Sequence, residues 1–363
     1  MKILFCIDTM TSGGAERVIA NLANYLSKLN HEVTILTLLD RECAYKLDSS
    51  VKYHSLKIRE GKKKIFDKIK SIFENKKKYL KYLENNKQDI IISFLPRASY
   101  YSAMVAKKSK TKLIISERND PSSIYNSIFK RVWTKFMYKK ADGFVFQTKM
   151  ASEFFNKDIV NRSVIIPNPV NDSFFIDYYK GNRKKIIVSI GRLSSQKNQL
   201  LLINAFKKVS DNHSDYKLII YGEGPLRNEL ENRIKELNLS DKVFLPGISK
   251  NILEDIYDAS MFVLPSNYEG MPNALMEALA LGIPSISTDC SCGGPRELII
   301  NNKDGLLIPV NDKESLIEAM ENLINNPDKC LKFSKASNKK MKKYNVEEIN
   351  KKWLAIINKV LKG

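Results

Sequence analysis

Short apolar runs alternate with amphipathic stretches along the first half of the chain. Runs of mostly apolar residues predict buried strands at residues 2–7, 32–38, 89–95, 112–116 and 143–146. After Gly13 and Gly14, apolar residues recur at the spacing of one helix face as far as Leu26. Strands that alternate with helices in this way are typical of parallel βαβ units.

The alternation begins again after residues 168–169, which indicates a second domain of the same kind. Strands are predicted at 186–190, 217–221, 242–245, 261–264 and 284–288, with helices starting near Asn198, Pro225, Lys250, Pro272 and Lys313. The irregular segment up to about residue 183 is a candidate linker, and an apolar stripe predicts a last helix over 346–361. We therefore predict an α/β chain with two doubly wound parallel-sheet domains, residues 1–170 and 171–345, and ligand binding in the cleft between them.

The most informative stretch is residues 265–284, which places two carboxylates at a strand-to-helix junction. The strand ends at Pro265, and Pro272 suits the first turn of the following helix. Glu269 is therefore expected in the loop, and Glu277 about one turn inside the helix. Free N–H groups at a helix start favour phosphate, while carboxylates accept hydrogen bonds from sugar hydroxyls. This combination suits a nucleotide-sugar.

A second polar loop follows the strand at 186–190 and runs from Gly191 to Asn198. Its cations, Arg192 and Lys197, can grip a diphosphate, Arg192 by bidentate contact and Lys197 as a point charge. Surface basic residues are usually only solvated. The predicted acidic loop and helix in the same domain favour the binding role.

Two glycine-rich loops are less specific. The pair Gly13-Gly14 lets the backbone approach a ligand closely, although such a pair is often no more than a turn. The segment 222–225 resembles half of a dinucleotide fingerprint, but Arg227 stands where the third glycine is needed. NAD binding is therefore not predicted.

Taken together and in order, these motifs resemble family 4 retaining glycosyltransferases of the GT-B fold. The resemblance covers nearly the whole chain and rests on these motifs: Gly13-Gly-Ala-Glu-Arg17, Gly191-Arg-Leu with Gln196-Lys-Asn198, Tyr221-Gly-Glu-Gly-Pro225, the Glu269–Glu277 pair, and Gly305-Leu-Leu. It implies two Rossmann-like domains with the active site between them. The N-terminal domain, completed by the helix at 346–363, would bind the acceptor, and the C-terminal domain would bind the nucleotide-sugar.

The resemblance also implies roles for individual residues. Arg192 and Lys197 would bind the donor diphosphate and stabilise the leaving group, and Glu269 would contact hydroxyls of the transferred sugar. Glu277 would hydrogen-bond the ribose. The other donor-binding residues implied are Gly13, Gly14, Gly191, Gly247, Gly270, Met271, Pro272 and Asn273. No metal and no other cofactor is expected.

The chain departs from the family in the loop after residue 116. Many relatives carry a histidine there, near the sugar, whereas this chain has Glu117 and Arg118. Arginine stays protonated and cannot act as a neutral acid or base. The two residues are candidates for the acceptor side of the site, and the departure leaves the identity of the transferred sugar open.

The net charge of +20 indicates an anionic partner, although a composition rich in Lys, Asn and Ile contributes to it. Much of the charge falls in residues 57–87, where Ile65, Ile69, Ile72, Phe73, Leu80 and Leu83 share one helical face. The basic candidates for an acceptor or membrane surface are Lys62, Lys63, Lys64, Lys70, Lys77 and Lys78. Such a helix can meet anionic lipid or a lipid-linked pyrophosphate, or can simply pack its apolar stripe on the domain. No nucleic-acid-binding module is found.

We thus expect a cytoplasmic enzyme, peripheral at the inner face of the cell membrane. It would move a hexosyl or N-acetylhexosaminyl unit, with retention, from a nucleotide-sugar, most simply a UDP-sugar, to a membrane-associated glycan such as one on a polyprenyl diphosphate. No apolar run reaches the length of a membrane span. Alternatives are a UDP-sugar epimerase or phosphorylase of the same fold, or a basic membrane-docking protein without activity.

Overall fold

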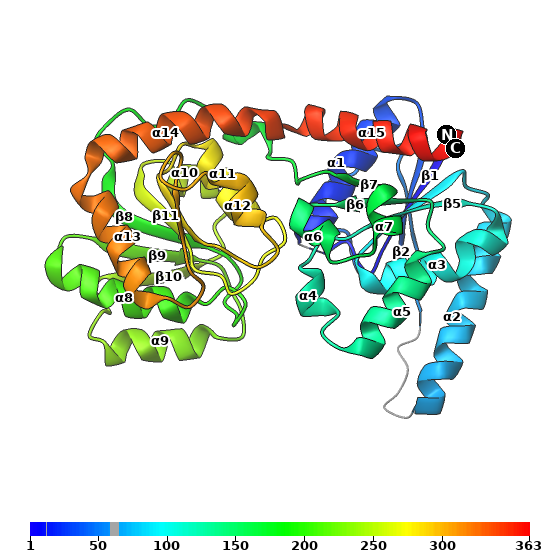
Figure 1. Cartoon of the computed structure of the whole chain (residues 1–363), viewed down its shortest axis with the longest axis horizontal. Coiled ribbons are helices and arrows are strands. Elements are labelled where there is room, and N and C mark those ends of the chain that lie inside the picture. Colours follow the sequence, from blue (N-terminus) through cyan, green and yellow to red (C-terminus); the bar gives the residue numbers. More distant parts are fainter. Residues whose placement is uncertain (12, 59–64) are drawn as a thin grey trace. The chain divides into compact units, whose positions relative to one another are not determined.

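The computed structural model describes residues 1–11, 13–58 and 65–363. The chain divides into two compact units, which we call unit 1 (residues 1–168 with 346–363) and unit 2 (residues 169–345). Each unit contains one fully parallel sheet with helices between its strands (Figure 1). The predicted α/β class with two doubly wound parallel sheets is confirmed.

Unit 1 is built on a sheet in the order β3-β2-β1-β4-β5-β6-β7. Its strands are β1 Lys2–Ile7, β2 Glu32–Thr37, β3 Lys52–Ser55, β4 Ile90–Phe94, β5 Lys112–Ser116, β6 Gly143–Phe146 and β7 Ser163–Ile165. Its helices are α1 Gly14–Lys28, α2 Ile65–Asn85, α3 Pro96–Ser109, α4 Pro121–Ile124, α5 Ile128–Tyr138, α6 Lys149–Glu153, α7 Lys157–Asn161 and α15 Val346–Lys362. The central strands β1 and β4 are buried and apolar along nearly their whole length because helices cover both faces of the sheet.

Unit 2 has a sheet in the order β10-β9-β8-β11-β12-β13. Its strands are β8 Lys184–Ile190, β9 Lys217–Tyr221, β10 Val243–Gly247, β11 Ala259–Leu264, β12 Ser285–Thr288 and β13 Leu306–Ile308. Its helices are α8 Gln199–Asn212, α9 Arg227–Glu236, α10 Ile252–Ile256, α11 Asn273–Ala280, α12 Gly294–Leu298, α13 Lys313–Asn325 and α14 Pro327–Met341, with 3₁₀ turns at Asp172–Phe174 and Lys342–Tyr344.

Each sheet reverses its winding at one pair of neighbouring strands. In unit 1 the chain steps outward from β1 to β2 and β3, and then resumes on the other side at β4. In unit 2 it steps from β8 to β9 and β10, and resumes at β11. At such a point the two following loops diverge to opposite faces, and open α/β sheets bind ligands in the resulting crevice.

The last helix, α15, packs in unit 1, although it is separated in sequence from the rest of that unit by the whole of unit 2. Its apolar stripe is buried, and Trp353 stacks on Phe94 of β4 with ring centroids 5.6 Å apart. Across the described residues, no helix combines the length and the hydropathy needed to cross a membrane.

Candidate functional site

The loops after β8 and β11 lie against each other at the switch point of unit 2. The backbone N–H of Asn267 donates to the Gln196 carbonyl (2.8 Å), and the Asn267 side chain donates to the Ser195 carbonyl (2.7 Å). In return, the Gln196 amide donates to the Tyr268 carbonyl (3.0 Å). These reciprocal bonds fix the two loops as one surface, so the side chains that they carry keep a constant geometry.

Lys197 and Glu269 form an ion pair across this junction. The Lys197 Nζ lies 2.5 Å from Glu269 Oε1, and the side chains are only 18% and 7% exposed. The Ser266 hydroxyl donates to the same carboxylate oxygen at 2.8 Å. Ion pairs with so little solvent contact are costly to break, because the remaining charge is left poorly solvated. The pair therefore holds a cation in place at the carboxyl end of β8.

The flanking residues shape this surface. Asn198 has a left-handed backbone (φ 50°), which asparagine tolerates, and its amide donates to Asn267 Oδ1 (3.1 Å) and Asn311 Oδ1 (2.7 Å). These bonds join the loops after β8, β11 and β13. Arg192 lies in the same loop as Lys197 and is exposed, so its guanidinium faces solvent beside the fixed lysine.

The acidic stretch has the arrangement expected from its sequence. Glu269 lies in the loop, Pro272 caps α11, and Glu277 is buried inside that helix. Gly270, Met271 and Pro272 lead the chain into α11, which starts at Asn273. The Lys197–Glu269 pair and the start of this helix therefore belong to one loop-helix junction.

A close backbone contact fixes the turn before α11. A Cβ on Gly294, at the start of α12, would lie 1.8 Å from the carbonyl oxygen of Gly270. We expect Gly294→Ala to lower stability by about 2–4 kcal/mol, because backbone on both sides must shift. It should also weaken nucleotide binding. Chemical denaturation measures the first effect and calorimetric titration with UDP the second.

The matched control for this substitution is Gly181→Ala. A Cβ there is also close to another atom, but that atom is the Tyr179 hydroxyl at the end of a side chain that can rotate. The control should change stability by less than about 1 kcal/mol. Equal losses in both variants would show that the Gly294 contact has no special role.

Glycines also bring the loops after β9 and β10 to the same edge. A Cβ on Gly222 (φ +138°) would lie 2.1 Å from the Gly191 carbonyl, and one on Gly224 would lie 2.3 Å from the Leu193 carbonyl. The Gly222 N–H donates to the Gly247 carbonyl at 2.8 Å. The glycine-rich turn thus allows close backbone contacts among three loops, and Gly191 and Gly247 both take part in these contacts.

Cys290, after β12, lies beside the acidic loop. Its thiol contacts the Ser266 carbonyl at 3.4 Å, and burial raises the pKa of Cys290 to about 11. The thiol is therefore protonated at neutral pH, when it is neither a nucleophile nor a strong metal ligand.

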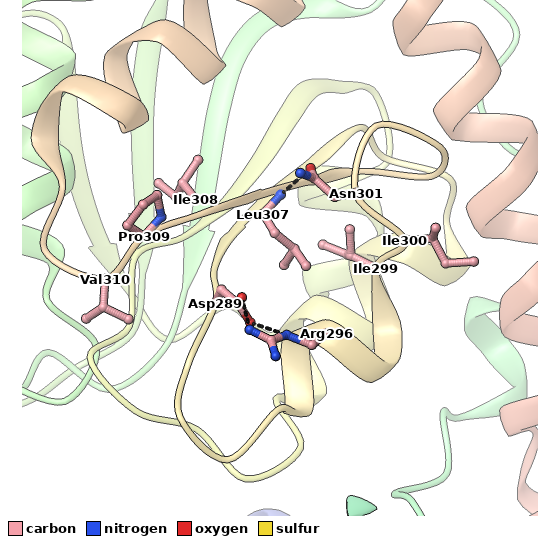
Figure 2. A pocket seen from close by; sticks show the side chains of 9 residues that line it. All are labelled: Asp289, Arg296, Ile299, Ile300, Asn301, Leu307, Ile308, Pro309 and Val310. Atoms are coloured by element: carbon pink, nitrogen blue, oxygen red, sulfur yellow. Dashed lines mark hydrogen bonds and ion pairs between the residues drawn. The ribbon is translucent and has the colours of Figure 1, made fainter. Parts of the chain in front are cut away.

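A separate pocket lies at the β13 side of the same unit (Figure 2). Arg296 of α12 and Asp289 pair across it, with Arg296 Nε 3.0 Å from Asp289 Oδ1, and apolar side chains such as Ile299 and Val310 complete the wall. None of the residues predicted for donor binding is among those lining it. The switch-point surface, which carries those residues, is therefore the better candidate site.

In unit 1, Gly13 lies beside the end of β1, at the start of α1, and Gly14 is the first residue of that helix. The Tyr45 hydroxyl accepts a hydrogen bond from the Gly13 N–H (2.9 Å) and donates one to the Gly13 carbonyl (2.6 Å). The Glu16 carboxylate also lies against Gly13, and burial raises the pKa of Glu16. Glu16 belongs to the motif at residues 13–17, whereas Tyr45 was not recognised as part of this loop, because only the fold brings it there.

Across the same switch point, Arg97 and Asp8 form an ion pair at 3.4 Å. Asp8 follows β1 and Arg97 lies in the first turn of α3. The intervening Leu95 has φ +69°, a backbone conformation that leucine rarely adopts. Unit 1 therefore has a charged and locally strained switch point of its own.

Glu117 and Arg118 are both buried in unit 1. Tyr125 and Tyr138 donate hydrogen bonds to Glu117 Oε2 (2.6 and 3.0 Å), and burial raises the pKa of Glu117. Arg118 donates to Ser116 Oγ (2.7 Å), and its guanidinium lies over the Phe94 and Trp353 rings at 5.1 and 5.2 Å. Burial lowers the pKa of Arg118 to about 9, so it is still a cation at neutral pH. These contacts give both side chains a role in packing unit 1.

The basic helix is only partly as expected. Lys62, Lys63 and Lys64 lie outside the described residues, while Lys70, Lys77 and Lys78 are exposed on α2. Its apolar stripe does not pack as one surface: Leu80 and Leu83 are buried, but Ile69, Ile72 and Phe73 are exposed. Of the two alternatives, packing of the apolar stripe on the domain therefore holds only for the C-terminal half of α2.

Two glycosyltransferase families match the two halves of the chain. Residues 12–174 match the family described as Glycosyltransferase Family 4, and residues 172–340 match Glycosyl transferases group 1. Among solved structures, HepE from Anabaena in complex with UDP is similar over 99% of this chain and 100% of its own, with 16% identity and a TM-score of 0.82. The fold is thus that of the GT-B glycosyltransferases.

Two relatives from Campylobacter jejuni are similar in sequence. One is a GalNAc-α-(1→4)-GalNAc-α-(1→3)-diNAcBac-PP-undecaprenol α-1,4-N-acetyl-D-galactosaminyltransferase, 31% identical over 99% of both chains. The other is an N-acetylgalactosamine-N,N'-diacetylbacillosaminyl-diphospho-undecaprenol 4-α-N-acetylgalactosaminyltransferase, 32% identical over 89% of this chain and 90% of its own. The chain belongs to glycosyltransferase family 4 and is a glycosyltransferase.

Proposed function

We propose that the protein transfers a hexosyl or N-acetylhexosaminyl unit, with retention, from a UDP-sugar to a polyprenyl-diphosphate-linked glycan. Binding of the donor is supported by one observation, the Lys197–Glu269 ion pair, whose Nζ and Oε1 atoms lie 2.5 Å apart. The pair lies in the loops that carry exposed Arg192 and lead into α11. Relatives with undecaprenyl-linked acceptors support the acceptor half. A lipid-linked acceptor in turn supports a peripheral position at the inner face of the cell membrane.

In this proposal unit 2 binds the donor and unit 1 the acceptor. Arg192 and Lys197 contact the diphosphate, Glu269 accepts hydrogen bonds from hydroxyls of the sugar, and Glu277 accepts one from the ribose. The backbone of Gly191, Gly247, Gly270, Met271, Pro272 and Asn273 lines the donor, and that of Gly13 and Gly14 lies near the reacting groups. Glu117 and Arg118 are proposed for the acceptor side in unit 1, where they are buried, as Glu269 and Glu277 are in unit 2.

Catalysis is then electrostatic. As the bond between the sugar C1 and the β-phosphate oxygen breaks, negative charge grows on the leaving diphosphate. Fixed cations and helix N–H groups aimed at that charge lower the barrier without rearranging. The acceptor hydroxyl oxygen attacks C1 from the same face, and its proton passes to the leaving phosphate. With charge neutralised in this way, we expect full activity in the presence of a chelator.

The test is a panel of UDP-sugars incubated with the purified protein, with released UDP as the readout and EDTA in parallel samples. We expect slow release from one sugar, unaffected by EDTA and lost in Glu269→Ala. An epimerase would instead convert the UDP-sugar without releasing UDP. Activity that requires added Mg²⁺ or Mn²⁺, or a trapped glycosyl ester on the protein, would contradict the mechanism.

A further inference from the structure

Large apolar side chains gather on the outer face of α5 in unit 1. Ile128 is 82% exposed and Phe129 is 77% exposed, and Val132, Trp133 and Phe136 continue the same stripe at helical spacing. The opposite side of α5 is buried through Thr134, Met137 and Tyr138. α5 is therefore amphipathic with its apolar face outward, which marks an interaction surface rather than a packing surface.

This surface continues onto α2 across a groove. The helices α2, α3 and α5 lie next to one another (Figure 1). Residues of all three line a groove of about 400 Å³, mainly with apolar and aromatic side chains. Ile72 of α2 faces Phe129 and Trp133 of α5 across it, and Ile69 and Phe73 are exposed on the same part of α2. The exposed parts of the two helices thus form one apolar face, which we call the α2–α5 face.

Positive charge borders the α2–α5 face. The sequences of α3 and α5 contain Lys and Arg but no Asp or Glu. Lys140, just after α5, has its Nζ 5.1 Å from the centre of the exposed Phe136 ring. Burial lowers the pKa of Lys140, and the neighbouring charges of Lys76 on α2 and Lys107 on α3 lower it further. Three helices therefore bring lysines together: α3 and α5 contribute no carboxylate, and on α2 six lysines outnumber Asp67, Glu74 and Glu84.

We propose that the α2–α5 face inserts into the surface of a bilayer that contains anionic phospholipid. The apolar stripe of α5 would lie at the boundary between headgroups and acyl chains, and Lys76, Lys107 and Lys140 would contact lipid phosphates. This inference rests on the proposed function, because a lipid-linked acceptor is reached at a membrane. A second copy of the chain fits less well, since a symmetric contact would bring two basic rims together.

The first measurement is sedimentation of the full chain with vesicles of phosphatidylcholine, with and without phosphatidylglycerol. We expect binding that depends on phosphatidylglycerol and is weakened by salt. Ile128→Ser and Phe129→Ser should each lower the partition coefficient by about tenfold or more, because each removes a large apolar side chain from the lipid. Changing Lys76, Lys107 and Lys140 to Gln should reduce the preference for phosphatidylglycerol.

The matched control is Ile248→Ser in unit 2. Ile248 is 77% exposed, close to the 82% of Ile128, but lies outside the α2–α5 face. Its partition coefficient should be that of the wild type. Trp133 gives a second readout, since the other tryptophan, Trp353, is fully buried. Vesicles should shift the emission to shorter wavelength in the wild type, but not in Trp133→Phe.

Several outcomes would overturn the proposal. They are no vesicle binding, equal binding to neutral vesicles, unchanged binding in both α5 variants, or a change of oligomeric state on Ile128→Ser, which would assign the face to a second copy. Titration with UDP in solution distinguishes a failure of the membrane proposal from a failure of the proposed function. The α5 variants should bind UDP as the wild type does, whereas a wild type that fails to bind UDP would contradict the proposed function alone.

Discussion

Lys197→Ala is expected to lower the rate of UDP release by about 10²–10³-fold, the cost of removing one fixed donor from a site where charge develops. Lys197 is a strong candidate because Glu269 and the interlocked loops hold its ammonium in one place. A freely moving lysine would lose more entropy on ordering and stabilise the leaving group less. The measurement is steady-state UDP release at saturating donor, with UDP affinity measured separately by calorimetric titration.

The matched control is Lys207→Ala. Lys207 also pairs with a carboxylate in unit 2, Asp211 at 2.6 Å, but on an exposed turn of α8. Lys207→Ala should change the rate of UDP release by no more than about twofold from that of the wild type, as expected for an exposed ion pair. Lys197→Arg keeps the charge but not the geometry and should recover only part of the rate.

A double substitution separates charge from simple misfolding. Lys197→Ala leaves Glu269 buried without its ion-pair partner, so Glu269→Gln in the same chain should recover stability but not rate. If instead Lys197→Ala kept more than a third of the wild-type rate, electrostatic stabilisation by this residue would be refuted.

The sequence predicts the central strands well and the edges poorly. β1, β5, β6 and β9 have the bounds that their apolar runs indicate. These strands lie inside their sheets, and β1, β5 and β6 are mostly buried, so their residues are mostly apolar in sequence. Of the four edge strands, β10 was predicted, at residues 242–245, whereas β3, β7 and β13 were not. They are short, and β3 and β7 are half exposed, which removes the apolar signal on which such predictions depend.

The features of the candidate site were also predicted only in part. The sequence places Glu269 before a helix and Glu277 inside it, because those positions depend only on local signals such as Pro272. The contact between Glu269 and Lys197 depends on the order of strands in the sheet, which the pattern of apolar residues does not contain. Their place in one predicted domain, and then the resemblance to a family, brought the two residues into one hypothesis, and the strand order gives the physical reason.

Arg118 and α5 are two cases in which only the structure shows which side chains are covered and which are exposed. In the sequence, Arg118 simply follows a strand end in unit 1, and only the structure shows that Trp353 of α15, from the other end of the chain, lies against its guanidinium. The apolar positions of α5 would ordinarily predict a helix face packed on the core, but the face that they form is exposed. Which face of an element is covered is a tertiary property, so neither result could be predicted locally.

The contact of Arg118 with α15 leads to the second large effect. We expect Trp353→Ala to lower the free energy of unfolding of unit 1 by about 3–5 kcal/mol, the usual cost of deleting a fully buried large aromatic side chain. The cost has two sources. Loss of the indole leaves a cavity beside Phe94, which also loses its stacking partner. The buried guanidinium of Arg118 loses one of the two rings that it faces.

Thermal unfolding followed by calorimetry is the appropriate measurement, because a chain with two units need not unfold in one step. The transition stabilised by UDP belongs to unit 2 and should stay in place, while that of unit 1 should move to lower temperature. Trp133→Ala is the matched control: the same substitution at a half-exposed site should change stability by less than about 1 kcal/mol. Trp353→Phe should fall between the two. If Trp353→Ala left the unit 1 transition unchanged, α15 would not be an integral part of unit 1, and the buried charge of Arg118 would need another source of stabilisation.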